Sequence, residues 1–218
     1  MNLYDTSLAQ IAQTIPGASA ILNQYRLSFC CGGQHTLKEA TAKANISTED
    51  VHKALLSLVP QTSPKEDWEA ASNAELINHL LERFHKVHRQ QLSELIRLAD
   101  RVETVHGDNP ECPLGLTDHL QYLAHELEAH MQKEEKILFP MLEKGMHQMA
   151  VGPISVMRQD HDDHNDAIHQ LDVITQNMTL PEGACNTWQA LYLGLRHFKD
   201  DLLQHIALEN DILFARSA

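Results

Sequence analysis

The sequence predicts an all-α protein in which a small helical domain precedes an antiparallel four-helix bundle. Four long segments carry apolar residues with a 3.6-residue period, Pro and Gly residues separate them, and no useful stretch alternates with period two. The stretch Pro60–Pro64 has the composition of a linker and follows a shorter Ala- and Leu-rich segment. We therefore expect a small domain at residues 1–60, a linker at 61–71 and the bundle at 72–218.

The small domain should contain short helices around one tightly turned loop. Paired glycines within Phe29–His35 predict the loop, because glycine adopts backbone angles that other residues avoid. Helix starts are indicated where a hydroxyl or carboxylate cap is followed by an acid in the first turn. These starts are Asp5/Thr6, Thr36 with Glu39, and Ser47 with Asp50.

The four bundle helices are bounded by Pro and Gly residues. Their short connections favour an up-down-up-down arrangement, which is the simplest way to bury four apolar stripes together. The expected helices are 72–105, 117–143, 154–177 and 185–215, with breaks at Gly107–Pro110, Pro113, Gly145, Gly152–Pro153, Pro181 and Gly183.

Composition excludes several classes of function. The formal net charge is −13, and residues 1–60 contribute none of it, since they hold four Lys/Arg and four Asp/Glu. An acidic chain with five Phe, two Trp and four Tyr is a poor nucleic-acid binder. Of the 15 His residues, 13 follow Leu76, which raises the expectation of a metal site in the bundle.

The chain also has the composition of a soluble cytoplasmic protein. No apolar run approaches the roughly 20 residues that span a bilayer, and the N-terminus lacks the pattern of a signal peptide. The cysteines at 30, 31, 112 and 185 fit neither a disulfide framework nor a CxxC zinc site. We therefore expect no membrane partner and a reducing compartment.

A repeated cassette indicates the chemistry of the bundle. His130-x3-Glu134 recurs as His205-x3-Glu209, and each copy continues with the same Ile-Leu-Phe run. A His-x2-His pair precedes each copy, with 45 residues from His85 to His130 and 44 from the corresponding histidine to His205. Residues four apart share a helix face, so each cassette should direct one imidazole and one carboxylate the same way. Ile137, seven residues after His130, predicts that this face continues into the apolar core.

Ligands from four facing helices predict a dinuclear metal site. Two helices would each provide a histidine and a glutamate, and the other two a histidine each. If both glutamates bridge, each metal has two imidazoles and two carboxylate oxygens, and positions remain for an oxo group, water or a small ligand. Imidazole and carboxylate without thiolate suit iron or manganese, and could also hold zinc. Our choice is iron, with ligands His85, His130, Glu134, His161, His205 and Glu209.

The His-x2-His pairs leave a choice, because residues three apart diverge by about 60° on a helix. His85 is preferred because apolar residues flank it, whereas His88 leads into a polar run. His161 is preferred over His164 only because it matches the interval. His88, His164 and Asp163 could instead orient the ligands, form a polar access path or lie on a solvated face.

The order His, His-x3-Glu, His, His-x3-Glu resembles the hemerythrin-like bundle. The segment with Cys30, Cys31 and two glycines is similar to the small N-terminal domain of the iron-sulfur cluster repair di-iron proteins. This resemblance implies a cytoplasmic, stress-induced homodimer with two iron ions in an oxo-bridged di-iron centre. Its partners would be damaged iron-sulfur proteins and nitric oxide, and its ligands fall on the six residues chosen above.

The sequence is compatible with several functions. The leading one is repair of iron-sulfur clusters damaged by nitrosative and oxidative stress, by supplying iron; whether the chain is also an enzyme is open. The same centre could reduce nitric oxide to nitrous oxide, with Cys30 and Cys31 as electron or ligand partners in redox or iron transfer. A third possible function is an oxygen- or redox-sensing module. Asn165 argues against it, because oxygen-carrying hemerythrins have a further histidine at this position. The cysteines could also be two small buried residues.

Overall fold

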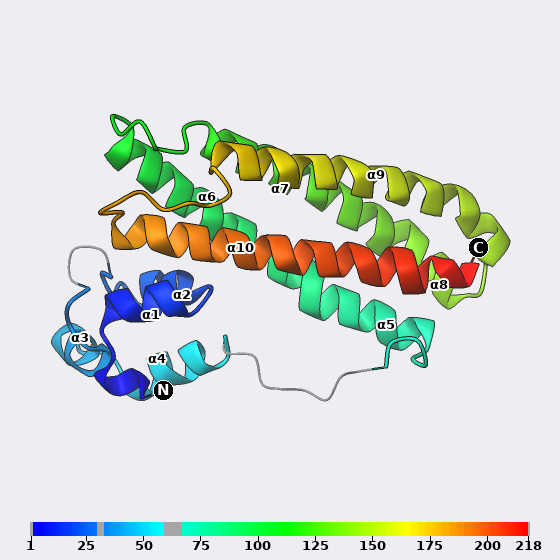
Figure 1. The fold of residues 1–218 in the computed structure, drawn as a ribbon. Helices are drawn as coiled ribbons and strands as arrows, with labels where there is room; N and C mark the ends of the chain where they lie inside the picture. Colours follow the sequence, from blue (N-terminus) through cyan, green and yellow to red (C-terminus); the bar gives the residue numbers. More distant parts are fainter. Residues whose placement is uncertain (1, 30–32, 59–66, 218) are drawn as a thin grey trace. The chain divides into compact units, whose positions relative to one another are not determined.

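The computed structural model describes residues 2–29, 33–58 and 67–217, and the regular structure of that part is helical (Figure 1). The one β feature among these residues is an isolated bridge between Ser7 and Thr36. The predicted all-α class is therefore confirmed. None of the described helices is long and apolar enough to cross a membrane.

The described chain forms two compact units. Unit 1 combines Met1–Thr62 with Glu94–Leu114 and Met178–His197, and unit 2 combines Ser63–Ser93, Gly115–Asn177 and Phe198–Ala218. The predicted linker falls partly on residues 59–66, which lie outside the described residues. The domain boundaries at residues 60 and 72 stay a prediction.

Unit 1 contains four short helices whose starts largely follow their capping residues. Thr36 caps α3 and forms a reciprocal capping box with Glu39, and the Ser47 side chain caps α4 by accepting from Asp50 N–H. The first expected start differs, because Ser7 caps α1 after a short 3-10 turn. The elements are η1 (Leu3–Asp5), α1 (Leu8–Thr14), α2 (Ala18–Gln24), α3 (Leu37–Ala44) and α4 (Thr48–Leu56).

Unit 2 brings four helical segments of the bundle together. α7 packs on α9, and α8 packs on α9 and on α5. The rings of Phe84 and His85 in η2 contact the ring of His205 in α10. The helices α6 and α10 run on from this unit into unit 1. The elements are α5 (Asn73–His79), η2 (Leu80–His85), α6 (Lys86–His106), α7 (Leu116–Lys133), η3 (Glu134–Leu138), α8 (Phe139–Glu143), α9 (His147–Ile174), α10 (Asn186–Ala207), η4 (Leu208–Leu213) and η5 (Ala215–Ser217).

The third long helix starts earlier than its sequence indicates. Gly152 and Pro153 were expected to break the chain, yet α9 already begins at His147. Pro153 is the seventh residue of α9 and lies inside the helix, where its missing N–H removes one intrahelical hydrogen bond without ending the helix. The other expected break, at Gly145, is present, and its φ of 67° is the left-handed conformation that glycine tolerates.

Three π-helical turns interrupt the bundle helices. The elements η2, η3 and η4 each end in an i+5 hydrogen bond, for example from Phe139 N–H to Glu134 O. A π turn holds more residues than an α turn, so it shifts the faces of the residues that follow it. Ile137 is consequently 54% exposed and the neighbouring Leu138 only 1%. The prediction that Ile137 faces the core was therefore wrong.

An apolar cluster in unit 2 surrounds these π turns. It joins buried residues from α5, η2, η3, α8, α9 and η4, together with Phe214 directly after η4. Each large apolar side chain buried here contributes about 1.5–3 kcal/mol relative to exposure. Its members are Leu76, Ile77, Leu80, Phe84, Leu138, Phe139, Leu142, Ala150, Ile154, Met157, Leu213 and Phe214.

Two glycines should respond oppositely to substitution by alanine. A Cβ at Gly33 would lie 2.1 Å from Phe29 O and 2.8 Å from Ala9 Cβ, so Gly33→Ala forces backbone to move and should destabilise the small helices. Gly152 lies within α9 with nothing within 4 Å of its added Cβ, so Gly152→Ala should stabilise by up to about 1 kcal/mol. Thermal unfolding followed by circular dichroism tests both, and a neutral Gly33→Ala would contradict the packing described.

Candidate metal centre

The structure brings all six predicted ligands together in the interior of unit 2. Two groups of four side chains place their candidate ligand atoms within 4.8 Å of one another. The groups share both glutamates, and every member is at most 1% exposed. The first group is His85, Glu134, His205 and Glu209, and the second is His130, Glu134, His161 and Glu209.

Each glutamate lies between two histidines. Oε2 of Glu134 is 3.4 Å from His85 Nε2 and 3.3 Å from His130 Nε2. Glu209 approaches His205 Nε2 through Oε1 and His161 Nε2 through Oε2, both at 3.1 Å. Two ligand atoms that bind one metal ion at about 2.1 Å lie about 3.0–3.4 Å apart. The spacing therefore matches that of atoms around shared cations.

The electrostatics of the two glutamates differ. Burial, and then the charge of Glu209, raise the pKa of Glu134 well above its ordinary value. Burial also opposes ionisation of Glu209, but His205 and His161 outweigh it and hold the pKa of that carboxyl well below its ordinary value. Mainly through burial, the pKa of His85 falls to about 4 and that of His130 to about 3. Neutral imidazoles are the form that binds metal.

Several inward-facing polar atoms have no hydrogen-bond partner among the described residues. They include His85 Nε2, both oxygens of Glu134 and Glu209 Oε2. An unsatisfied buried polar group costs about 1–3 kcal/mol, and more when it is charged. A cation bound between these atoms would satisfy them, so the residues present fit a metal centre with bridging carboxylates.

Outer hydrogen bonds fix the orientation of three of the histidines. His85 Nδ1 lies 2.9 Å from Glu135 Oε1, and His130 Nδ1 lies 3.2 Å from Asp160 Oδ2. His161 Nδ1 lies 3.1 Å from Asn210 Oδ1. These acceptors place the ring proton on Nδ1 and leave Nε2 free to bind metal.

None of these outer acceptors was predicted from the sequence. A signal was present, since each stands next to a proposed ligand: Glu135 beside Glu134, Asp160 beside His161, and Asn210 beside Glu209. Neighbouring positions on a helix point about 100° apart, so each reaches a histidine of another helix. Which histidine it reaches depends on packing that the sequence does not display.

The second histidine of each His-x2-His pair is also buried. His88 is 0% exposed and His164 is 3%, so neither lies on a solvated face, whereas Asp163 is exposed. Neither belongs to a group of candidate ligands among the described residues. The His88 ring lies 5.3 Å from that of His205, and the His164 ring 5.0 Å from that of His130.

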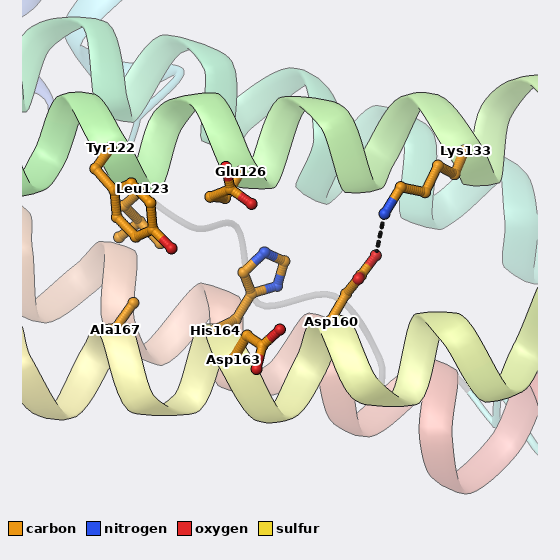
Figure 2. A pocket seen from close by; sticks show the side chains of 8 residues that line it. All are labelled: Tyr122, Leu123, Glu126, Lys133, Asp160, Asp163, His164 and Ala167. Atoms are coloured by element: carbon orange, nitrogen blue, oxygen red, sulfur yellow. Dashed lines mark hydrogen bonds and ion pairs between the residues drawn. The ribbon is translucent and has the colours of Figure 1, made fainter.

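A small polar pocket between α7 and α9 is lined by His164. Figure 2 shows its imidazole pointing from α9 toward α7, with the Lys133–Asp160 contact of 2.7 Å on one side. The cavity volume is about 30 Å³, which is enough for water but not for a large ligand. It is lined by Tyr122, Leu123, Glu126, Lys133, Asp160, Asp163, His164 and Ala167.

Cys30 and Cys31 lie outside the described residues. The residues on either side are held in place: Phe29 O accepts a hydrogen bond from Asn186 Nδ2 at 2.9 Å, and Gly33 O accepts one from Ala9 N–H at 3.0 Å. The role of the two thiols stays a prediction.

Replacing each glutamate by its neutral analogue should change stability in opposite directions in protein stripped of metal. The pKa of Glu134 in the folded protein is raised above 4.5. Its contribution to the stability of the fold is therefore fully present at acidic pH and is lost as the pH rises. Glutamine cannot ionise, so Glu134→Gln avoids this loss of stability and should stabilise the fold at pH 7. Glu209 has a lowered pKa, and its contribution is present above pH 4.5 and lost on acidification. Glu209→Gln should therefore destabilise at pH 7.

The two changes should have opposite signs at pH 7 and should both shrink toward pH 4. Chemical denaturation of both variants at the two pH values measures them. Equal effects of the two substitutions at pH 7 would contradict the assigned charge states.

Comparison with known proteins supports a cation-binding centre. Residues 76–217 match the family described as the Hemerythrin HHE cation binding domain, and residues 4–59 match a domain described as being of unknown function. Iron-sulfur cluster repair protein YtfE of Dickeya chrysanthemi is 47% identical over 217 residues, which cover 100% of this chain and 98% of the relative. The proteins of the same name from Salmonella paratyphi B and Salmonella newport are each 45% identical over the same shares. The chain therefore belongs to the iron-sulfur cluster repair family whose members carry a hemerythrin-like bundle.

Proposed function

We propose that this protein holds two iron ions in its bundle and supplies iron to damaged iron-sulfur proteins. The observation that carries the proposal is the pair of ligand groups that share Glu134 and Glu209. Imidazole and carboxylate ligands without thiolate suit iron, and the full-length relatives are named for cluster repair. The six ligands are those predicted from the repeat.

The charge balance of the site favours release as well as binding. Two glutamates offset only two of the four positive charges of a ferrous pair, and close cations repel each other strongly in a buried site. The further carboxylates Glu135 and Asp160 act through the imidazoles that they orient. An acidic chain attracts cations to its surface, which favours loading.

The other parts of the proposal concern partners. Cys30 and Cys31 would receive iron or pass it on, because thiolates bind iron and react with nitric oxide. When bound, iron would serve as cargo and would also present open positions to small diatomic ligands. The protein acts, on this proposal, as a cytoplasmic homodimer under nitrosative or oxidative stress, with an oxo-bridged iron pair in its resting form.

Transfer of iron to a cluster-free protein tests the proposal. The full-length protein is loaded anaerobically with ferrous iron, its iron is measured by elemental analysis and Mössbauer spectroscopy, and it is mixed with an apo iron-sulfur protein, sulfide and a thiol. We expect cluster absorbance to appear as iron leaves the donor. Cys30→Ala/Cys31→Ala should load normally and transfer slowly, whereas Glu134→Ala/Glu209→Ala should not load.

The same preparation separates the rival functions. Full iron retention with catalytic formation of nitrous oxide from nitric oxide, lost on removing the thiols, would replace repair by nitric oxide reduction. A stable oxygenated spectrum without iron loss would replace it by sensing. Circular dichroism serves as the control that each variant remains helical.

A further inference from the structure

One of the four inward histidines lacks an outer acceptor. His85, His130 and His161 each have a carboxylate or amide oxygen at Nδ1. His205 does not: its Nδ1 is buried and has no hydrogen-bond partner among the described residues. Its Nε2 lies 3.1 Å from Glu209 Oε1 and can donate to it. A histidine that binds metal through Nε2 must carry its proton on Nδ1, and that proton then requires an acceptor.

His88 stands where such an acceptor is needed. It is 0% exposed, and its Nε2 also lacks a partner within the described part of the chain. The rings of His88 and His205 have centroids 5.3 Å apart and planes inclined by 39°. Two imidazoles hydrogen-bonded through facing nitrogens at about 3 Å have centroids about 5 Å apart. The separation therefore suits a direct hydrogen bond.

A chain of hydrogen bonds determines which nitrogen of His88 can accept. Asp201 accepts from Arg83 and, through Oδ2, from Gln91 Nε2 at 2.7 Å. Because the amide nitrogen of Gln91 faces this carboxylate, its oxygen faces His88 Nδ1, at 3.1 Å. An amide oxygen only accepts, so His88 Nδ1 carries the proton. His88 Nε2 is consequently an unprotonated acceptor.

The geometry points to His88 as the positioning residue of His205: its Nε2 accepts from His205 Nδ1–H when His205 binds a metal ion through Nε2. This inference rests on the proposed metal centre and adds to it a role for Arg83, Asp201 and Gln91. While Nε2 of His205 donates to Glu209, its Nδ1 has no proton to share, and the two nitrogens form no hydrogen bond in the structure. A proton on Nδ1, as metal binding through Nε2 requires, would give His88 Nε2 a donor in the adjacent ring.

His88 differs from the other acceptors in charge. Burial first, and then His205, lower the pKa of His88 to about 3, so it stays neutral. The carboxylates Glu135 and Asp160 stay ionised, because bonds to His85 and Arg89 lower the pKa of the first and bonds to Lys133 and His130 that of the second, in each case against a cost of burial. Because His205 belongs to only one of the two ligand groups, and the His88 ring lies beside it, the loss of His88 should weaken that group alone.

Anaerobic titration with cobalt(II), followed by its visible absorption, tests the inference on the full-length chain. We expect wild type to bind two ions. In His88→Leu, the affinity for one ion should fall 10–100-fold, as is typical when an outer partner of a metal-binding histidine is removed. His88→Gln, which retains an acceptor oxygen, should recover most of it. His164→Leu is the matched control, because His164 is buried in the corresponding place but His130 already contacts Asp160.

Nitrogen NMR of zinc-loaded protein gives a second readout. The Nδ1 proton of His205 should be protected from exchange in wild type and lost or exposed in His88→Leu. Equal affinities in wild type and His88→Leu, or the same weakening in His164→Leu, would overturn the role of His88. Failure of wild type itself to bind two ions would instead overturn the proposed centre, so the two failures are distinguishable.

Discussion

The burial of two glutamates among four histidines is the constraint on which the rest of unit 2 depends. Removing a carboxylate from water is costly unless positive charge or hydrogen bonds replace the lost hydration. His205 and His161 compensate Glu209 in this way, but no comparable compensation reaches Glu134, whose pKa is raised by burial and by the charge of Glu209. A cation bound between the two groups would compensate both carboxylates. The apolar cluster, the π turns and the outer acceptors make sense as parts that hold these groups in place for it.

The candidate ligands could be predicted from the sequence because the same motif occurs twice. One His-x3-Glu cassette would be weak evidence, but two copies at matched intervals indicated six residues that the structure gathers into two groups of candidate ligands. The all-α class followed from periodicity. The π turns did not, because nothing in Glu134–Leu138 distinguishes an i+5 bond from an i+4 bond locally. The misplaced Ile137 is the direct result, as helix phase beyond a π turn depends on packing.

The two halves of the repeat are chemically unequal although their sequences match. Glu209 lies 3.1 Å from each of its histidines, whereas Glu134 lies 3.3 Å and 3.4 Å from its own, and their pKa values shift in opposite directions. The acceptors differ as well, with carboxylates for His85 and His130 but an amide for His161. Part of this inequality arises inside the cassette, where Glu135 and Asn210 occupy corresponding positions directly after the two glutamates, so the matched spacing alone could not display it.

Anomalous X-ray diffraction at the iron edge, from crystals of anaerobically loaded full-length protein, tests the central claim most directly. The account predicts two anomalous peaks in unit 2, one within each group of four ligands, with Glu134 and Glu209 contacting both. A single peak, or peaks that leave either glutamate without a metal contact, would contradict it.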